Sequence, residues 1–362
     1  LSQLYYEAGT EDKAQMAIEL AERECASIKN MPDLEVKELF ACLYQAKGRV
    51  SDSYDVSLQA YAKALNLFEQ LEQSFLNQIK PEMDTSKSIA NIKSDQIFAK
   101  SMVQNMQDHI ATVLINRGML NHNKGKYHLA YGDFVRASEL VAMTKTKNST
   151  EYITCRNNVA ICEMNLGLYP DAIKTLDDIS AIIEAQYGKD SYYYAMCLQN
   201  YGLYYRATFD FNKMVEVTLQ ANEMFKSLLG ENSNEFVGTS LNLGVAYTSL
   251  GKYDLAEVFL NKAYQFYSVQ PNRDENLMFA KVLQNLGNLY CTLKRYPDAA
   301  SKYKESIHII ERVCGAISIE MANCLTSIGR EYIVMRSEVS IECLSRALSI
   351  LKELDMYSDP LS

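Results

Sequence analysis

Residues 241–267 read LNLGVAYTSLGKYDLAEVFLNKAYQFY. On either side of Gly251 the apolar and small residues are spaced three and four apart, which is typical of two amphipathic helices joined by a short turn. Gly244 and Ala256 are small where two such helices must approach closely, and Leu260 supplies the bulk between them. The stretch therefore predicts an antiparallel helix pair.

The same pattern recurs along most of the chain. The corresponding residues are Gly118, Tyr127, Ala130 and Phe134; Ala160, Tyr169, Ala172 and Leu176; Gly202, Phe211, Met214 and Ala221; Gly287, Tyr296, Ala299 and Tyr303; and Gly329, Tyr332, Leu344 and Ala347. A regular period of this length is typical of a solenoid, in which one helical unit stacks on the next. We expect an all-α right-handed superhelix of about seven complete units and a partial first one.

These residues resemble the tetratricopeptide repeat, and more closely its long-helix variety in kinesin light chains. The connectors Tyr187-Gly188-Lys189-Asp190 and Leu229-Gly230-Glu231-Asn232 are also of the kinesin light chain kind, with each glycine placed for a left-handed helix cap. The usual unit of about 34 residues is lengthened by about one turn in each helix. The chain lacks tryptophan and the proline that often closes the repeat, two departures that leave the predicted fold unchanged.

The spacing also predicts how the chain is organised. Residues 1–78 form a partial and a degenerate unit, residues 96–356 form six consecutive units, and residues 357–362 are a tail. Residues 79–95 between them form an inserted loop or linker, because a polar stretch lies there and the units on either side are too far apart. The sequence begins with Leu rather than Met, about one helix short of a full unit, and we expect it to be a fragment.

Composition excludes several classes of protein. The 362 residues carry 36 Lys and Arg against 45 Asp and Glu, a formal net charge of −9, whereas a nucleic-acid-binding surface needs a basic stripe. No apolar run is long enough to span a membrane, and the first ten residues lack the features of a signal peptide. The 48% of hydrophobic residues is ample for a packed core.

Asparagine recurs at one position of the repeat. Asn116, Asn158, Asn200, Asn242 and Asn285 follow one another at intervals of 42, 42, 42 and 43 residues, each two positions before the small residue of its first helix. Ser327 replaces asparagine in the last unit, so the row ends there. A polar side chain that returns in every unit forms a row along one face of a solenoid.

The resemblance implies that first helices line a concave groove and that this asparagine row faces it, where related arrays bind the main chain of a peptide. A primary amide offers donors and an acceptor that match the N–H and C=O of an extended strand. By the same register the neighbouring residues are Asn157, Gln199, Arg206, Lys281, Gln284, Asn288 and Arg330. Their mild positive bias suits a segment with Asp, Glu or a terminal carboxylate. Alternatively, the asparagines serve only the stacking of the units.

Other chemistry has little support in the sequence. Cys155 and Cys162 lie seven residues apart on one predicted helix, but no second pair completes a metal site. The four histidines have no metal-ligand spacing, and no phosphate-binding or catalytic motif is present. We therefore expect no enzyme activity, no cofactor and no metal. The nine cysteines, which lie within helical patterns, predict buried free thiols in a reducing compartment.

The sequence therefore predicts a cytoplasmic, non-enzymatic scaffold or adaptor that holds an extended segment of a partner protein in its groove. One alternative is a structural subunit of a cytoskeletal assembly, ciliary or microtubule-associated, which would use the outer wall and ends of the array. A peptide-sensing regulator of the bacterial kind shares the same architecture.

Overall fold

The computed structural model describes residues 16–21, 23, 33–51, 53–79 and 89–354. Within these residues every regular element is a helix, which confirms the predicted all-α class. The chain divides into two compact units, residues 1–179 and residues 180–362, and the division falls inside one helix. Of the predicted partial unit at the start of the chain, the structure describes only residues 16–21 and 23, and the tail at 357–362 lies outside the described residues.

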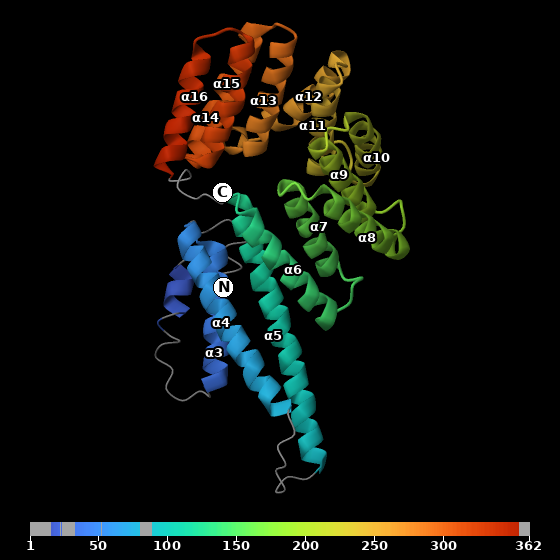
Figure 1. The fold of residues 1–362 in the computed structure, drawn as a ribbon, viewed down its shortest axis with the longest axis vertical. Helices are drawn as coiled ribbons and strands as arrows, with labels where there is room; N and C mark the ends of the chain where they lie inside the picture. The colour runs from blue at the N-terminus through green and yellow to red at the C-terminus, as the bar shows by residue number, and fades with distance from the viewer. Residues whose placement is uncertain (1–15, 22, 24–32, 52, 80–88, 355–362) are drawn as a thin grey trace. The chain divides into compact units, whose positions relative to one another are not determined.

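The helices of both units are labelled in Figure 1. In the first unit they are α3 (Asp33–Val50), α4 (Tyr54–Ile79), α5 (Ile89–Asn123), α6 (Tyr127–Thr144), α7 (Thr150–Asn165) and α8 (Tyr169–Tyr187), whose last residues belong to the second unit. The second unit continues with α9 (Tyr192–Ala207), α10 (Phe211–Leu229), α11 (Asn234–Ser249), α12 (Tyr253–Ser268), a short 3-10 turn η1 (Arg273–Glu275), α13 (Leu277–Thr292), α14 (Tyr296–Cys314), α15 (Ile319–Val334) and α16 (Val339–Glu353). The odd-numbered helices are the first helices of the predicted pairs, and the even-numbered ones are the second helices.

Small residues set the contact between the two helices of a pair. A Cβ atom added at Gly244 would lie 2.5 Å from Leu260 Cγ, and one added at Gly287 would enter the ring of Tyr303. Leu260 and Tyr303 are fully buried, so neither has room to move aside. Only a glycine allows the first helix to approach its partner this closely, as the sequence predicted.

Serine fixes the start of most first helices. Ser149, Ser191, Ser233 and Ser318 each precede a first helix, and each hydroxyl accepts a hydrogen bond from the backbone N–H three residues later. Asn276 caps α13 in the same way. These side chains satisfy donors that a helix leaves unpaired at its start, and each such cap typically contributes about 1 kcal/mol.

The predicted linker at 79–95 is too long. Ile79 is the last residue of α4, and α5 already begins at Ile89, so the linker prediction is wrong for residues 89–95. The extra residues between these units lengthen α4 to 26 residues and α5 to 35. Residues 80–88 lie outside the described part of the chain.

A charged pair is buried where α5 meets α6. Arg117 donates to both carboxylate oxygens of Asp133, from Nε at 3.0 Å and from a terminal nitrogen at 2.6 Å. Asn121 Nδ2 donates to the same carboxylate at 3.3 Å, and Tyr54 Oη on α4 donates to Asn121 Oδ1 at 2.9 Å. The network thereby joins three helices through one buried acid.

Lys294, in the turn between α13 and α14, has a strained backbone. Its φ is 59°, whereas glycine occupies the equivalent turn positions 167 and 251. A left-handed conformation costs a residue other than glycine about 1–2 kcal/mol. We expect Lys294→Gly to raise the free energy of unfolding by roughly 1 kcal/mol in urea denaturation. The matched change Lys304→Gly, on the exposed side of α14, should lower it by about the same amount. Equal losses in both variants would show that the turn is unstrained.

Glu163 on α7 is a buried acid, 4% exposed, whose Oε2 has no hydrogen-bond partner within the described residues. Burial raises the pKa of this carboxyl above its usual 4.5, and the hydroxyl of Thr175 and the charge of Arg156 only partly oppose the rise. The folded protein therefore holds this proton more tightly than the unfolded chain does. The stability that the group contributes is present at low pH and is lost as pH rises from 4.5 through the raised pKa.

We expect Glu163→Gln to abolish this dependence, because an amide does not ionise. The unfolding free energy of the variant minus that of the wild type should increase as pH rises above about 4.5 and then level off. Urea denaturation from acid to neutral pH measures the difference. A difference that does not change with pH would mean that the carboxyl titrates at an ordinary pKa.

No helix in the described part of the chain is long and apolar enough to cross a membrane.

Candidate binding site

The first helices of the second unit pack against one another on one side of it. α9 packs against α11, α11 against α13, and α13 against α15. Within the described residues the second helices pack against first helices and make no more than marginal contact with one another. The first helices therefore line the shorter, inner side of this unit. We call the exposed side of α9, α11, α13 and α15 the inner face.

Two predicted site residues place positive charge on the inner face. Arg206 on α9 and Lys281 on α13 are both exposed to solvent, yet burial among the surrounding helices lowers the pKa of each side chain. The charge of Arg206 lowers the pKa of Lys281 further, so the two cations lie near one another. Both side chains can thus be reached by solvent, yet neighbouring helices remove part of their hydration. A concave surface has this effect on the side chains that line it. Neither cation forms an ion pair with a carboxylate within the described residues.

Arginines on the second helices of this unit, unlike Arg206, form ion pairs with carboxylates. Arg312 on α14 pairs with Glu275 at 2.8 Å, and Arg346 on α16 pairs with Glu311 at 3.1 Å. Arg295, which precedes α14, pairs with both Glu257 and Asp298. By contrast Arg330, a predicted site residue on first helix α15, is exposed and forms no ion pair in the described part of the chain. The arginines of the second helices are neutralised by carboxylates, whereas among the described residues the cations of the inner face are not.

The three asparagines of the row in this unit have different surroundings. Asn200 is only 7% exposed and interacts within the protein. Asn285 is half-buried, and its Nδ2 donates to the backbone oxygen of Lys281 in its own helix at 2.8 Å. Asn242 on α11 is half-buried and makes no side-chain hydrogen bond within the described residues. Of the three, Asn242 has the amide that is most available to a ligand.

Two predicted neighbours of the row hold the fold together. Gln284 Nε2 donates to Ser306 Oγ at 3.1 Å and to Cys324 Sγ at 3.3 Å, which ties α13 to α14 and α15. Asn288 Oδ1 accepts a hydrogen bond from the buried hydroxyl of Tyr303 at 2.9 Å. Both side chains therefore make hydrogen bonds to neighbouring helices, which makes them less available to a ligand than Asn242.

The remaining row members lie in the first unit. Asn116 on α5 has a buried Nδ2 without a partner in the described part of the chain. Asn158 on α7 is half-buried and makes no side-chain hydrogen bond there, whereas its neighbour Asn157 interacts within the protein. The amides of Asn116 and Asn158 thus keep hydrogen-bonding capacity.

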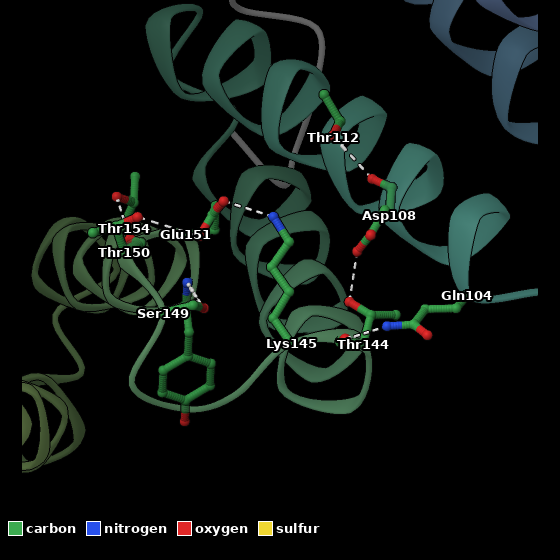
Figure 2. Close-up of polar contacts among 10 residues, drawn as sticks. Gln104, Asp108, Thr112, Thr144, Lys145, Ser149, Thr150, Glu151 and Thr154 are labelled. Atoms are coloured by element: carbon green, nitrogen blue, oxygen red, sulfur yellow. Dashed lines mark hydrogen bonds and ion pairs between the residues drawn. The ribbon is translucent and has the colours of Figure 1, made fainter. Parts of the chain in front are cut away.

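Figure 2 shows polar contacts among residues of α5, α6 and α7 in the first unit. Thr144 at the end of α6 donates to Asp108 Oδ1 at 2.6 Å, and Gln104 donates to the Thr144 carbonyl. Lys145 pairs with Glu151 at 2.6 Å, which raises the pKa of the lysine and lowers that of the glutamate. These charges neutralise one another and fix the connector between α6 and α7.

A pocket that the sequence did not predict opens at the starts of α9, α11 and α13. Its volume is about 430 Å³, and it is lined by Tyr192, Met196, Gln199, Asn234, Glu235, Gly238, Tyr267, Asn276 and Met278. Only Gln199 was among the predicted site residues. The sequence does hold a signal for it, because the lining residues Met196 and Gly238 each stand four residues before a row asparagine.

The cysteines fit the prediction of free thiols. None of the eight in the described residues forms a disulfide bond, and burial raises the pKa of Cys155 and Cys162 to about 12. A thiol must lose its proton to bind a metal, so these two are poor ligands at neutral pH. No cluster of three metal-binding side chains occurs in the described part of the chain.

Comparison with protein families identifies the repeat. A tetratricopeptide repeat model matches residues 156–213, and a second matches residues 279–320. These segments are tetratricopeptide repeats. The matched segments include α9, α14 and most of α13, and so they carry Arg206 and Lys281. Among curated proteins, none matches the chain.

Solved structures share the fold at low identity. Aspartyl phosphate phosphatase F from Bacillus subtilis is 12% identical over 99% of this chain and 83% of its own, with a TM-score of 0.56. The Rap conjugation gene regulator of plasmid pLS20, solved with the Phr* peptide, is 10% identical over 92% of this chain and 99% of its own, with a TM-score of 0.54. The tetratricopeptide-like repeats of a Podosopora anserina putative kinesin light chain are 14% identical over 56% and 96%, with a TM-score of 0.47.

Proposed function

We propose that the protein is a non-enzymatic interaction scaffold, whose second unit binds an extended, acidic segment of a partner protein along the inner face. The observation that carries this proposal is the pair Arg206 and Lys281, two exposed cations that lie near one another without a carboxylate partner in the described residues. Tetratricopeptide arrays generally serve protein–protein interaction, and the Rap regulator of similar fold was solved with a peptide.

The two cations disfavour one another in the free protein. Each repels the other, and each has lost part of its hydration. A carboxylate placed beside them removes the repulsion and supplies charge-assisted hydrogen bonds, which are stronger than neutral ones. Because the surrounding helices remove part of the water around both cations, salt screens this attraction less than it would on an open surface. Both effects favour an anionic ligand.

The shape of the inner face favours an extended ligand over a compact one. α11 lies between α9 and α13, so a ligand that reaches both cations must cross α11, where Asn242 keeps a free amide. An amide can bond one backbone N–H and one C=O of an extended chain. Each such bond contributes only about 0.5–1.5 kcal/mol net, so the charges provide most of the selectivity.

Three fluorescein-labelled decapeptide pools test the proposal. They are randomised except at the two central positions, which are both Glu, both Gln or both Lys. Fluorescence anisotropy of the full chain should show the tightest binding to the Glu pool, weaker binding to the Gln pool and the weakest to the Lys pool. Equal affinity for all pools, or preference for the Lys pool, would refute an acidic segment. No binding to any pool would refute the peptide-binding function.

A further inference from the structure

The pocket at the starts of α9, α11 and α13 differs in chemistry from the rest of the inner face. Two tyrosines and two methionines form its walls, and its volume of about 430 Å³ lies in the ~300–1,000 Å³ range of ordinary ligand pockets. Burial raises the pKa of both Tyr192 and Tyr267, so their hydroxyls stay protonated at neutral pH. These two tyrosines therefore offer aromatic rings and neutral hydroxyl groups to a ligand.

One acid lines this pocket without a cation to neutralise it. The carboxylate of Glu235 accepts a hydrogen bond from the hydroxyl of Tyr192 at 3.2 Å and forms no ion pair within the described residues. Gln199 adds a buried Oε1 that has no donor in the same part of the chain. Both oxygens are acceptors, and a ring face also attracts positive charge. Such a lining is complementary to a group that carries several N–H donors and a positive charge.

The pocket and the cation pair share the same helix faces. Met278 and Lys281 are three residues apart on α13, a rise of about 4.5 Å, and Gln199 and Arg206 are seven apart on α9, a rise of about 10.5 Å. An extended chain advances about 3.3 Å per residue. The distance along the helices between the pocket and the cations is therefore the length of about one to three extended residues.

We propose that this pocket receives the side chain of an arginine or lysine in the bound segment. The partner's segment would then carry a basic residue about one to three positions from its acidic ones. Glu235 would face the basic residue, and Arg206 and Lys281 would face the acidic ones. This inference rests on the proposed function, because it assigns a second contact to the same bound segment.

The test adds one fixed residue to the Glu-pair decapeptide pools. Arg or Gln is placed three positions before the pair in one set and three positions after it in a second set. We expect the wild-type chain to bind the Arg pool of one set about tenfold more tightly than the Gln pool of that set, as measured by fluorescence anisotropy. The set that shows the preference also gives the direction of the bound segment.

Variants assign the preference to the pocket. Glu235→Gln should reduce the affinity for the Arg pool to that for the Gln pool, and Gln199→Met should reduce it less. The matched control is Glu223→Gln, which removes an exposed, unpaired acid from second helix α10 and should leave the preference intact. If Glu235→Gln fails to fold, Gln199→Met alone decides, since an undiminished preference in it would overturn the assignment.

The outcomes separate the two proposals. Equal binding of the Arg and Gln pools in both sets overturns the basic-residue pocket, while a retained preference for Glu pairs over Lys pairs leaves the acidic-segment proposal standing. An Arg preference that survives in Glu235→Gln also overturns the pocket assignment. If no pool binds at all, both proposals fail.

Discussion

Replacing Asp133 with alanine should destabilise the first unit by about 3–5 kcal/mol, because it leaves the guanidinium of Arg117 without its counter-charge in a largely buried position. Asp133 is 6% exposed and accepts two hydrogen bonds from Arg117 and one from Asn121. Urea denaturation followed by circular dichroism measures the loss as a lower midpoint for the first unfolding transition.

The exposed pair Arg136–Glu69 is a matched control for this prediction. Its N–O distance is 2.6 Å, the same as the shortest contact of Arg117 with Asp133, but its side chains are 49% and 41% exposed. Glu69→Gln should therefore change stability by at most about 1 kcal/mol. Similar losses in the two variants would mean that burial does not set the strength of the Arg117–Asp133 pair. The double change Arg117→Met with Asp133→Leu should recover much of the lost stability, because no charge stays buried without a partner.

The second large effect concerns binding. Neutralising both inner-face cations, Arg206→Gln with Lys281→Gln, should weaken binding of the Glu-pair pool on the order of a hundredfold, if each charge-assisted contact contributes about 1.5 kcal/mol. Stability should change little, since neither cation has an ion pair to lose in the described part of the chain. The remaining affinity should also depend less on salt than that of the wild type.

The control for this variant removes two positive charges from second helices. Arg312→Gln with Arg346→Gln changes the net charge equally but acts away from the inner face. It should leave affinity for the Glu-pair pool within about twofold, because exposed charges at a distance are screened. An equal loss of binding in both double variants would mean that net charge, and not the inner face, attracts the ligand.

The fold was predictable from sequence because the packing of a solenoid is local. The spacing from Gly244 to Leu260 and from Gly287 to Tyr303 is 16 residues in these two repeats. This spacing fixes how the two helices of a repeat meet. The linker was harder to predict, because helices α4 and α5 are longer than the helices of the other repeats. No periodic residue in the sequence marks where these two helices end. The polar stretch at 81–88 identified the position of the insertion but not its length.

The site was predictable only in part. Register placed Arg206 and Lys281 on first helices, and the structure brings them near one another on the inner face. The same register also grouped Gln284 and Asn288 with them, although both make hydrogen bonds to neighbouring helices. A repeat position does not say whether a side chain meets solvent or the next helix. The pocket at Glu235 needs residues from several successive units, and only the stacking of those units brings them together.

The most direct test of the central claim is photo-cross-linking, which locates the bound segment on the protein. p-Benzoylphenylalanine replaces Asn242 on the inner face in one protein, and in a second it replaces Val258, an exposed residue of second helix α12. After irradiation with the Glu-pair decapeptide pool, we expect labelled peptide to become attached at position 242 and not at position 258, and an excess of unlabelled Glu pool to prevent it. Attachment at position 258 with none at position 242 would contradict the account and would favour a protein that binds through its outer wall.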